Sequence, residues 1–334
     1  MVREGVGLTM PEIVAPSLDV SILLTNWNVR DLMKDAILSV YRQTKDITYE
    51  VIVVDDGSTD GSVEMLRKDF PDVRLLVNEK NVGFSKANNL GVTIARGKYI
   101  LLLNTDTLLV NNPVKVLFDF LETHPEAGVC GAWLKGRDMS SQVSYGNFPS
   151  FHQAVVDALF LNDLFPRAGL PNIGTYPLES STKPIEVDYV TGAAILIRKE
   201  IIDRIGLFDE WFRAYCEETD FCYRVKHVVN RKVYFVPDAH VIHLVGLSYS
   251  KVRKYQLQLM YSSFNKFLTK HHGSVYSFCT RLLYAWRQFL KLLVRYLLYA
   301  VAPPAKKELK RNYMLHTWYG VRYSLFPNEQ FTGS

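Results

Sequence analysis

An apolar run that stops abruptly at three polar residues, within positions 99–107, constrains the fold more than any other stretch. The run YILLL is followed by Asn104, Thr105 and Asp106. Such an uninterrupted run is typical of a strand buried on both faces of a parallel sheet. Ligands of open α/β sheets bind at the carboxyl ends of the strands, so Asp106 is placed to hold a divalent cation or a ligand donor. The alternative is that Asp106 starts a turn or caps the helix near Pro113.

Strands and helices alternate along most of the chain. Apolar and β-branched runs predict strands near 19–28, 51–54, 73–77, 99–103, 128–133, 187–197 and 232–236, and helical spacing predicts helices near 32–41, 63–66, 85–95, 114–121 and 153–161. This alternation predicts an α/β fold with a single doubly wound, mostly parallel sheet and flanking helices. No GxGxxG follows the first strand and no GxxxxGK[ST] occurs, so a dinucleotide fingerprint and a P-loop are both unsupported.

Two predicted strands end in acidic residues. Asp55 and Asp56 follow the strand at 51–54, just as Asp106 follows its own strand. The carboxyl ends of parallel strands meet at one edge of a sheet, and core packing does not explain carboxylates there. The proline-rich stretch 136–186 is predicted to be a binding loop for an acceptor, with a plain surface excursion as the alternative.

A third acidic group is predicted to open a helix. Glu217, Glu218 and Asp220 are three carboxylates within four residues. Glu217 and Asp220 share a helix face, whereas Glu218 is turned by about 100° from Glu217. Asp220 and Arg224 stand at i and i+4, which predicts an ion pair along the helix. A solvated acidic first turn, favoured by the helix dipole, is the alternative.

Six ordered segments together carry a resemblance to a known family. They are Val20–Asn28, Val54–Gly61, Asn78–Asn89, Leu102–Thr107, Gly192–Asp220 and His243–Ser248. In this combination the chain resembles the large inverting glycosyltransferases of family 2, which have the GT-A fold, and in particular the rhamnosyltransferase-like branch that makes bacterial surface polysaccharides. The resemblance covers roughly residues 18–250, and residues 251–334 carry no motif of the family.

The resemblance implies a set of contacts to the nucleotide and the donor sugar. They are Thr25, Asn26, Asn28, Asp55, Asp56, Asn78, Asn81, Gly83, Asn88, Asn104, Thr105 and Gly192. Asp55 is expected on the base, since a carboxylate can accept the N3–H of uracil or thymine. For Asp56 the alternative is a turn former beside Gly57. Gly83 is expected to permit close approach of the backbone to the nucleotide.

A cation site for Mg²⁺ or Mn²⁺ is also implied. Residues 104–106 occupy the position of the family's DxD motif, with asparagine in place of the first acid, so Asp106 is the only carboxylate of the triplet. His243, in the motif His-x-x-Gly-x-Ser, matches the family's downstream ligand position; a core histidine is the alternative. His240 is expected to be structural. Oxygens of the donor diphosphate would complete the coordination.

The carboxylate cluster matches the family's Glu-Asp motif, whose second acid is the base. Glu218 is therefore expected to be the catalytic base, with glutamate replacing aspartate, and Glu217 and Asp220 are expected to belong to the same catalytic group. An acceptor hydroxyl needs a base in the transition state, and a cation stabilises the departing nucleoside diphosphate without proton transfer. The implied reaction is a single in-line displacement at the anomeric carbon, with inversion.

The implied donor is dTDP-L-rhamnose, with UDP-hexoses next, and the implied acceptor is a glycan or a lipid-linked glycan in cell-surface polysaccharide synthesis. Two other classes of protein remain as alternatives. A sugar-nucleotide nucleotidyltransferase would show a glycine-rich basic loop after the first strand, where residues 26–30 contain no glycine. An inactive GT-A-like binding protein would not be expected to keep Asp106, Glu218 and His243.

Charge divides the chain into an acidic body and a basic tail. Residues 251–334 carry fourteen lysines and arginines against two glutamates, a net charge of +12, whereas the rest of the chain carries −7 and the whole chain +5. Such a tail favours an anionic surface as its partner. The acidic body makes nucleic acid an unsupported partner.

The tail contains an apolar stretch with regularly spaced polar residues. Arg281, Gln288, Lys291 and Arg295 fall on one helical stripe, which predicts a basic amphipathic helix that contacts the membrane peripherally through 275–311. Charges at this spacing argue against a spanning helix. The alternative is docking of the apolar side on the catalytic domain or on a second copy, as in a homodimer.

The predicted organisation has three parts. They are an N-terminal tail (1–17), a GT-A catalytic domain (18–250) with a nucleotide-binding half (18–110) and an acceptor half (111–250), and a basic amphipathic helical region (251–334). No signal peptide is evident, and the four cysteines lack CxxC spacing, which indicates a reduced compartment. A cytoplasmic protein, peripheral on the inner face of the cell membrane, is expected.

Overall fold

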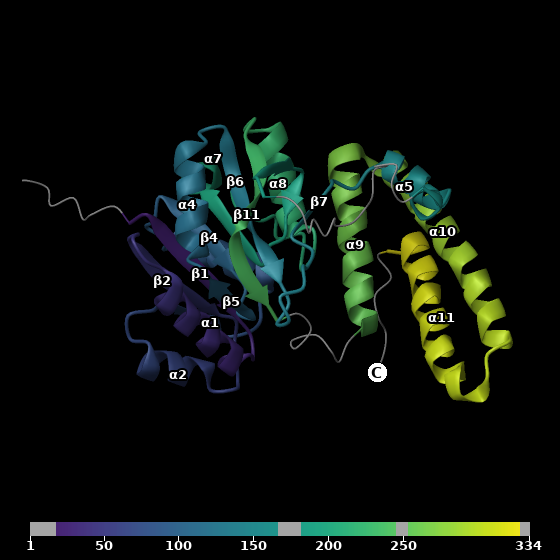
Figure 1. Cartoon of the computed structure of the whole chain (residues 1–334), viewed down its shortest axis with the longest axis horizontal. Coiled ribbons are helices and arrows are strands. Elements are labelled where there is room, and N and C mark those ends of the chain that lie inside the picture. Colours follow the sequence, from purple (N-terminus) through teal and green to yellow (C-terminus); the bar gives the residue numbers. More distant parts are fainter. Residues whose placement is uncertain (1–17, 166–181, 245–252, 328–334) are drawn as a thin grey trace, which may run out of the picture.

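The structure, a computed structural model, describes residues 18–165, 182–244 and 253–327 (Figure 1). Its centre is a nine-stranded sheet of order β3-β2-β1-β4-β10-β6-β11-β5, with β8 paired to β11, and β7 and β9 form a separate pair. The strands are β1 Val20–Asn26, β2 Tyr49–Asp55, β3 Arg74–Val77, β4 Tyr99–Leu103, β5 Thr107–Val110, β6 Ala127–Lys135, β7 Tyr145–Gly146, β8 Ile185–Val187, β9 Tyr189–Val190, β10 Ala194–Arg198 and β11 Lys232–His243. The helices are α1 Arg30–Gln43, α2 Ser62–Asp69, α3 Phe84–Thr93, α4 Pro113–Thr123, α5 Phe151–Ala158, α6 Leu161–Leu164, α7 Lys199–Ile205, α8 Glu217–His227, α9 Arg253–His272, α10 Ser274–Ala300 and α11 Pro304–Leu325.

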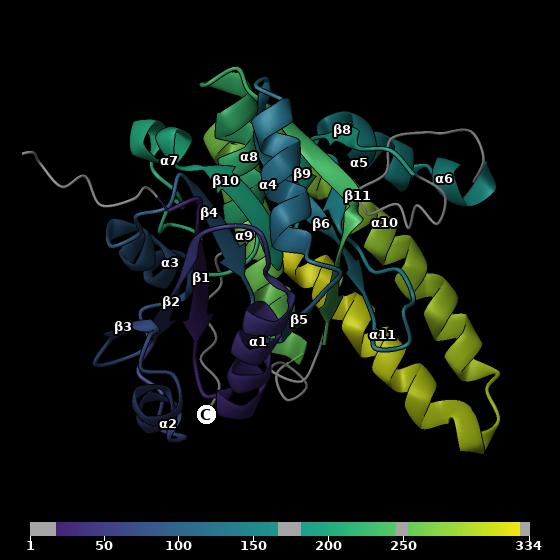
Figure 2. The same cartoon turned by 60° about the vertical axis from the view of Figure 1, so that its left-hand side comes forward.

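Helices cover both faces of the sheet, because successive strand residues point to opposite sides. Helices α1, α2 and α4 pack with one set of strand side chains, which includes Ile22, Val53 and Leu101. Helices α3, α7 and α8 pack with the alternate set, which includes Leu23 and Leu102 (Figure 2). Both sets are buried, which explains why these strands read as continuous apolar runs. The predicted doubly wound sheet with flanking helices is confirmed.

Strand β10 brings a distant segment to the edge of the sheet where β4 ends. Strands β3, β2, β1 and β4 run parallel, so their carboxyl ends share one edge. β10 runs antiparallel between β4 and β6. Its start therefore meets the end of β4, and the backbone N–H of Asn104 donates to the carbonyl of Ala193 at 3.0 Å. Residues around 192 thus lie beside residues 104–106.

Two predicted strands differ in extent from those observed. The predicted strand at 187–197 is divided into β8, β9 and β10, and the Asp188 carboxylate between β8 and β9 accepts a hydrogen bond from the Phe148 N–H at 2.9 Å. The strand predicted at 232–236 continues as β11 to His243, with a register shift between Val236 and His240. Pro237 lies in this shift, where its missing N–H does not interrupt a ladder. Residues 166–181 of the predicted acceptor loop lie outside the described residues.

The C-terminal region is helical, as predicted. α9 lies against the catalytic domain, where Phe267 and Leu268 form a buried cluster with Phe212. The Ser263 hydroxyl of α9 donates to the Ala214 carbonyl at 2.7 Å. α10 and α11 contact each other as a hairpin, and α10 also contacts α5 and α9 (Figure 1). Among the helices that the structure describes, none combines the length and the apolar character needed to cross a bilayer.

The polar stripe predicted on α10 faces the protein. Arg295 donates to the Tyr313 carbonyl of α11 at 2.9 Å, and the Gln288 amide donates to the Tyr261 hydroxyl of α9 at 3.3 Å. Arg287, the residue before Gln288, lies 3.4 Å from the Asp163 carboxylate. A row of large apolar side chains of α10, among them Leu282, Phe289 and Leu293, is exposed. The first part of α10 packs on α5 of the catalytic domain, where Tyr276 contacts Phe151.

Candidate active site

Asp106 and His243 meet at the edge of the sheet where β4 ends. Asp106 lies in the turn between β4 and β5, and β5 pairs antiparallel with β11 so that Thr107 stands opposite His243. This register puts the His243 Nε2 3.3 Å from the Asp106 Oδ1, with side chains that are 18% and 13% exposed. The Leu244 N–H donates to the Asp106 carbonyl at 2.8 Å. Two residues predicted as metal ligands are therefore neighbours with access to solvent.

The donor set of this pair fits a divalent cation. Two ligands about 2.1 Å from one octahedral ion, at about 90°, lie about 3 Å apart, which is close to the separation of the two side chains. A carboxylate oxygen and an imidazole nitrogen are both ligands of Mn²⁺, and the carboxylate also suits Mg²⁺. Within the described residues no group of three or more His, Cys, Asp and Glu side chains is gathered for a metal. A cation here would need further ligands from the substrate or water.

The ends of β1 and β2 form a hydrogen-bonded cluster beside this pair. The Asn26 amide donates to Asp55 Oδ2 at 2.8 Å and to the hydroxyls of Ser58 and Ser62 at 3.1 and 3.0 Å. Asp55 Oδ1 accepts the Ser58 N–H at 2.8 Å, and the residue is 0% exposed. Both oxygens of Asp55 thus accept hydrogen bonds from the protein, so direct contact with a base requires a local rearrangement. The Asn26 Oδ1 is buried and lacks a hydrogen-bond partner.

Asp56 holds the loop between β3 and α3. Its carboxylate accepts hydrogen bonds from the Asn78 amide and the Val82 N–H, both at 2.9 Å, and from the Gly83 N–H at 3.0 Å. Gly57, at φ +75°, lies against this loop, where an added Cβ would come within 2.7 Å of the Lys80 Cα. A left-handed residue without a side chain is required at such a close approach. The turn and the loop are therefore fixed relative to one another.

The other predicted nucleotide contacts lie on the same edge with different exposures. The Asn28 side-chain oxygen accepts the Thr59 N–H at 2.8 Å, which ties the loop after β1 to the loop after β2. Asn81 is exposed, whereas Asn88 is buried and donates to the Phe84 carbonyl at 2.9 Å within α3. Thr25 is half-buried near the end of β1. These residues lie along one rim of the sheet. Asn88 is buried beneath this rim, where it hydrogen-bonds within α3.

Gly192 joins the cation-type pair to the carboxylates of α8. It follows directly on the chain from Thr191 and precedes Ala193, which accepts the hydrogen bond from Asn104. A Cβ added to Gly192 would lie 3.8 Å from the Glu218 Cβ. Asn104, Gly192 and Glu218 therefore follow one another in space, although they are far apart in the sequence.

Glu217 and Glu218 are neighbouring acids with raised pKa values. Burial raises the pKa of Glu218 to about 7. Burial, together with the nearby charge of Glu218, raises the pKa of Glu217 well above its ordinary value. Glu217 Oε2 is buried without a hydrogen-bond partner. A carboxylate with a pKa near neutrality can accept a proton at physiological pH and return it to solvent, which is the property of a general base.

Asp220 differs from these two acids because three nitrogen-bearing side chains surround its carboxylate. It is 0% exposed, and Arg224, Lys270 and His271 each place a nitrogen 2.8 Å from its carboxylate. Burial alone would raise the pKa of Asp220, but the hydrogen bonds from His271 and Lys270 and the charge of Arg224 outweigh it and lower the pKa to about 2. The predicted ion pair with Arg224 is confirmed. Asp220 is thus a permanently charged anchor between α8 and α9.

Two of these partners were not predicted from the sequence. Lys270 and His271 lie near the end of α9, in the region that carries no family motif, and Lys270 also pairs with Asp209 at 2.6 Å. No short-range pattern in the sequence connects them to Asp220. The only sequence feature that could have indicated them is a lysine and a histidine in the last turn of a helix, and the helix dipole also explains that placement.

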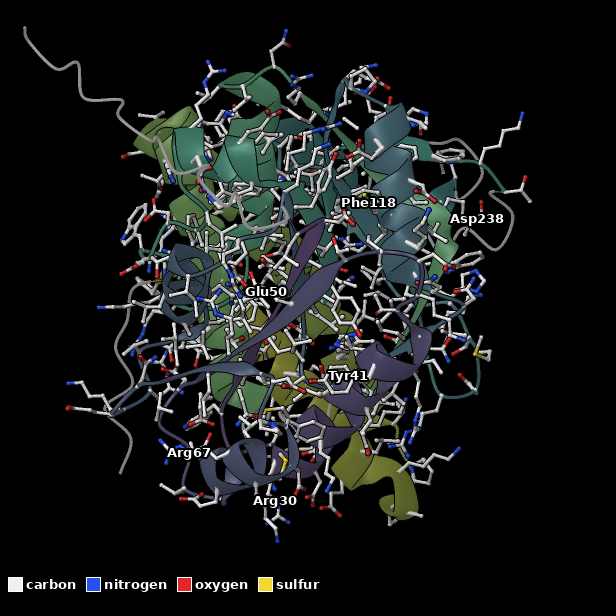
Figure 3. The ribbon with its side chains drawn as sticks, turned by 90° about the vertical axis from the view of Figure 1, so that its left-hand side faces the viewer. Arg30, Tyr41, Glu50, Arg67, Phe118 and Asp238 are labelled. Carbon is white, nitrogen blue, oxygen red and sulfur yellow. The ribbon has the colours of Figure 1, made fainter. Side chains whose placement is uncertain are left out.

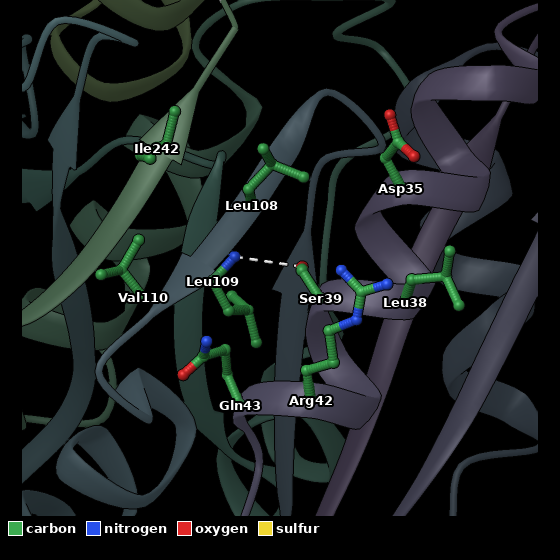
Figure 4. A pocket seen from close by; sticks show the side chains of 9 residues that line it. All are labelled: Asp35, Leu38, Ser39, Arg42, Gln43, Leu108, Leu109, Val110 and Ile242. Atoms are coloured by element: carbon green, nitrogen blue, oxygen red, sulfur yellow. Dashed lines mark hydrogen bonds between the residues drawn. The ribbon is translucent and has the colours of Figure 1, made fainter.

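A separate pocket lies between α1 and the edge strand β5 (Figure 4). It has a volume of about 330 Å³ and is lined by Asp35, Leu38, Ser39, Arg42, Gln43, Leu108, Leu109, Val110 and Ile242. The Ser39 hydroxyl in its wall accepts the Leu109 N–H at 3.1 Å. None of the predicted site residues lines it, so it is distinct from the site at the strand ends.

The Asp106–His243 pair lies at the edge of the sheet where β4 ends, and Gly192 lies between this edge and Glu218 of α8. The sequence model of glycosyl transferase family 2 matches residues 21–206, more than half of the chain. The chain belongs to this family and is a glycosyltransferase. The predicted family membership is confirmed, and a nucleotidyltransferase is excluded.

Among curated relatives, the chain is 28% identical over 239 residues to the N-acetylglucosaminyl-diphospho-decaprenol L-rhamnosyltransferase of Mycobacterium tuberculosis, covering 67% of this chain and 75% of the relative. Among solved structures, it resembles a mannosyltransferase from Pyrobaculum calidifontis in complex with GDP-mannose and Mn²⁺, at a TM-score of 0.60 and 15% identity, over 96% of this chain and 92% of that one. It also resembles GalNAc-T7 with UDP, GalNAc and Mn²⁺, at a TM-score of 0.56 and 15% identity, over 93% of this chain and 56% of that one. The predicted GT-A fold is confirmed.

Proposed function

We propose that this protein transfers a sugar from a nucleoside-diphosphate donor to a glycan or lipid-linked glycan acceptor, with inversion and with Mg²⁺ or Mn²⁺ as cofactor. The proposed donor is dTDP-L-rhamnose, and a UDP-hexose is the second choice. The relative from Mycobacterium tuberculosis is named as an L-rhamnosyltransferase on a diphospho-decaprenol acceptor, which supports this choice. The single observation that carries the proposal is the contact of Asp106 with His243 on the same rim as Glu218.

The rim formed by the loops after β1, β2 and β3 takes the nucleotide. Asn26, Asn28 and Asp56 fix these loops through the hydrogen bonds described above, and Asp55 orients Asn26. The wider set of donor contacts in this proposal is Thr25, Asn26, Asn28, Asp55, Asp56, Asn78, Asn81, Gly83, Asn88, Asn104, Thr105 and Gly192. The unpartnered Asn26 Oδ1 is a buried acceptor that a small rearrangement would offer to the base.

Asp106 and His243 would hold the divalent cation, whose positive charge stabilises the departing diphosphate. Glu218 accepts the proton of the acceptor hydroxyl as the hydroxyl attacks the anomeric carbon. Its pKa of about 7 leaves a large ionised fraction at neutral pH. Burial and the charge of Glu218 raise the pKa of Glu217, which favours its neutral form and so limits repulsion within the pair. Asp220 positions α8 and does not touch the reacting atoms.

The protein then works at the cytoplasmic face of the membrane that carries the lipid-linked acceptor, as a peripheral protein and as a monomer or a homodimer. The proposal is tested by incubating the chain with dTDP-L-rhamnose, UDP-glucose, UDP-N-acetylglucosamine and GDP-mannose, each with and without MnCl₂. Release of the nucleoside diphosphate and thermal stabilisation are followed for each donor. The proposal is supported by a donor that raises the melting temperature of the protein only with Mn²⁺ and whose sugar is transferred to a GlcNAc-diphospho-lipid with inversion. No metal-dependent stabilisation by any of the four would refute it.

A further inference from the structure

The α10–α11 hairpin exposes an apolar surface. Along α10, large apolar side chains recur every three or four positions, which places them on one stripe of the helix. They are Val275, Phe278, Leu282, Trp286, Phe289, Leu293 and Leu297. Their exposed fractions run from 43% for Leu282 to 79% for Val275. Exposed apolar side chains in a continuous patch of this length mark an interaction surface.

A groove between α10 and α11 continues this stripe. It has a volume of about 530 Å³ and is lined by Leu292, Leu293, Tyr296, Met314, Leu315 and Trp318. Leu293 belongs to both the stripe and the groove. We call the stripe and the groove together the hairpin face.

The orientation of the hairpin face is fixed by the polar side of α10. Arg295 and Gln288 are hydrogen-bonded to α11 and α9, and Arg287 lies within ion-pair distance of Asp157 and Asp163. Turning the apolar stripe inward would break these contacts and bury the charges without partners, which is costly. The apolar stripe therefore stays outside.

The charge of the hairpin identifies the partner. Residues 274–325 contain nine lysines and arginines and a single acid, Glu308. Lys306, Lys307 and Arg311 are exposed where α10 passes into α11. A second copy would bring two strongly basic hairpins together, which like-charge repulsion opposes. An anionic bilayer offers hydrocarbon to the apolar stripe and opposite charge to the lysines at once.

We propose that the hairpin face lies on an anionic lipid bilayer, with Trp286 and Trp318 at the level of the headgroups and Lys306 and Lys307 on lipid phosphates. Tryptophan suits that level because its ring is apolar and its N–H polar. The hairpin thereby holds the catalytic domain at the surface from which a lipid-linked acceptor projects. This deepens the membrane location proposed above. Vesicle binding without donor or acceptor tests it, so its failure is distinguishable from failure of the proposed reaction.

The test is sedimentation of the full chain with phosphatidylcholine vesicles, with and without phosphatidylglycerol. Binding is expected on the anionic vesicles, weaker at high salt and about tenfold or more weaker on neutral vesicles. Leu293→Asp is expected to lower binding by at least about tenfold, because it places a charge on the inserted face. The double variant Lys306→Glu, Lys307→Glu is expected to lose binding to anionic vesicles by a similar factor.

Matched controls lie on the catalytic domain. Val228→Asp adds the same charge at an exposed apolar residue after α8, and the double variant Arg67→Glu, Lys68→Glu reverses two exposed charges on α2 (Figure 3). Both are expected to bind anionic vesicles as the unmodified chain does. Equal losses in these controls would show that the effect is not specific to the hairpin face, and would overturn the proposal.

Two further outcomes count against it. A chain that does not sediment with phosphatidylglycerol vesicles has no such surface. A stable dimer in light scattering that Leu293→Asp splits, without any vesicle binding, assigns the hairpin face to a second copy instead. Circular dichroism melting confirms that each variant is folded, and Trp286→Ala, which adds no charge, replaces Leu293→Asp if that variant unfolds. Unchanged vesicle binding by Trp286→Ala or Leu293→Asp would also overturn the proposal.

Discussion

Lys270 of α9 places its ammonium nitrogen 2.8 Å from the carboxylate of Asp220 on α8, the helix that carries Glu218. The same lysine reaches Asp209 at 2.6 Å, in the loop before that helix. The region after the catalytic domain therefore contributes directly to the position of the proposed base. A truncation that removes α9 removes these contacts along with the hydrophobic packing of Phe267.

Asp220→Asn is expected to destabilise the fold by about 3 kcal/mol, because it removes the buried negative charge that Arg224, Lys270 and His271 share. The folded pKa of Asp220, about 2, lies below its ordinary value of 3.8, so its charge contributes stability above about pH 4 that is lost as the pH falls through 2. The variant should lack this part of the acid transition. Urea denaturation at several pH values measures both effects. Asp203→Asn is the control, because Asp203 forms an ion pair with Lys199 at the surface. This substitution should lower the free energy of unfolding by less than about 1 kcal/mol.

Glu218→Gln is expected to keep donor and metal binding and to lower the rate of transfer by about 10²–10⁴, because only the proton acceptor is removed. Donor binding is measured by thermal shift, and transfer by release of the nucleoside diphosphate in the presence of acceptor. Glu200→Gln, an exposed glutamate of α7, is the matched control and should be fully active. Undiminished transfer by Glu218→Gln would remove Glu218 from the role of base.

The rate of transfer is expected to rise with pH through an apparent pKa near 7. The base must be ionised, and burial raises the pKa of Glu218 to about 7. Well below that pH the rate should fall about tenfold per pH unit, while the affinity for the donor changes less. Steady-state rates at saturating donor and acceptor, taken at constant ionic strength, measure the profile. A rate that is flat across this range argues against titration of the Glu217–Glu218 pair.

Asp106→Asn and His243→Ala are each expected to abolish the stabilisation that Mn²⁺ adds to a bound nucleotide sugar, since each removes one of two neighbouring protein donors. Thermal shift with donor, with and without Mn²⁺ and with EDTA as the metal-free reference, measures this. His240→Gln on the same strand is the control, because His240 packs against Trp133 with ring centroids 5.7 Å apart. Metal-dependent stabilisation that survives in Asp106→Asn would place the cation elsewhere.

Glu217→Gln is expected to stabilise the protein increasingly as the pH rises into the alkaline range and to have little effect near pH 4.5. The folded pKa of Glu217 is raised above its ordinary value of 4.5, so ionisation of this buried acid costs stability as the pH rises. Melting temperatures as a function of pH measure the difference. If the melting temperatures of the variant and the unmodified chain change with pH in parallel, ionisation of Glu217 does not lower the stability of the fold.

The order of elements and the chemical type of the site were predictable from the sequence. An unbroken apolar run of strand length such as 99–103 is typical of a doubly buried strand, and a polar residue directly after such a strand lies at its end. Asp55 and Asp106 could therefore be placed on one edge without a structure. The ion pair of Asp220 with Arg224 could be predicted because four residues of helix separate them.

Other features depended on contacts between distant segments. The reversal of β10, the long β11 with its shift at Pro237, and the saturation of Asp55 by Asn26 and Ser58 have no local signature. The polar stripe of α10 was visible in the sequence. Which way it faces was not, because periodicity fixes the sides of a helix and not the neighbour that each side meets.

The sequence alone determined most of the strands and helices of the sheet and the acids that follow strands β2 and β4, because backbone sterics and hydrophobic periodicity act over a few residues. Tertiary structure alone decided that Lys270 and His271 contact Asp220, and that burial raises the pKa of Glu218 to about 7. Protonation depends on burial and on charges within a few ångströms in space, and those distances are set by the packing of α9 on α8.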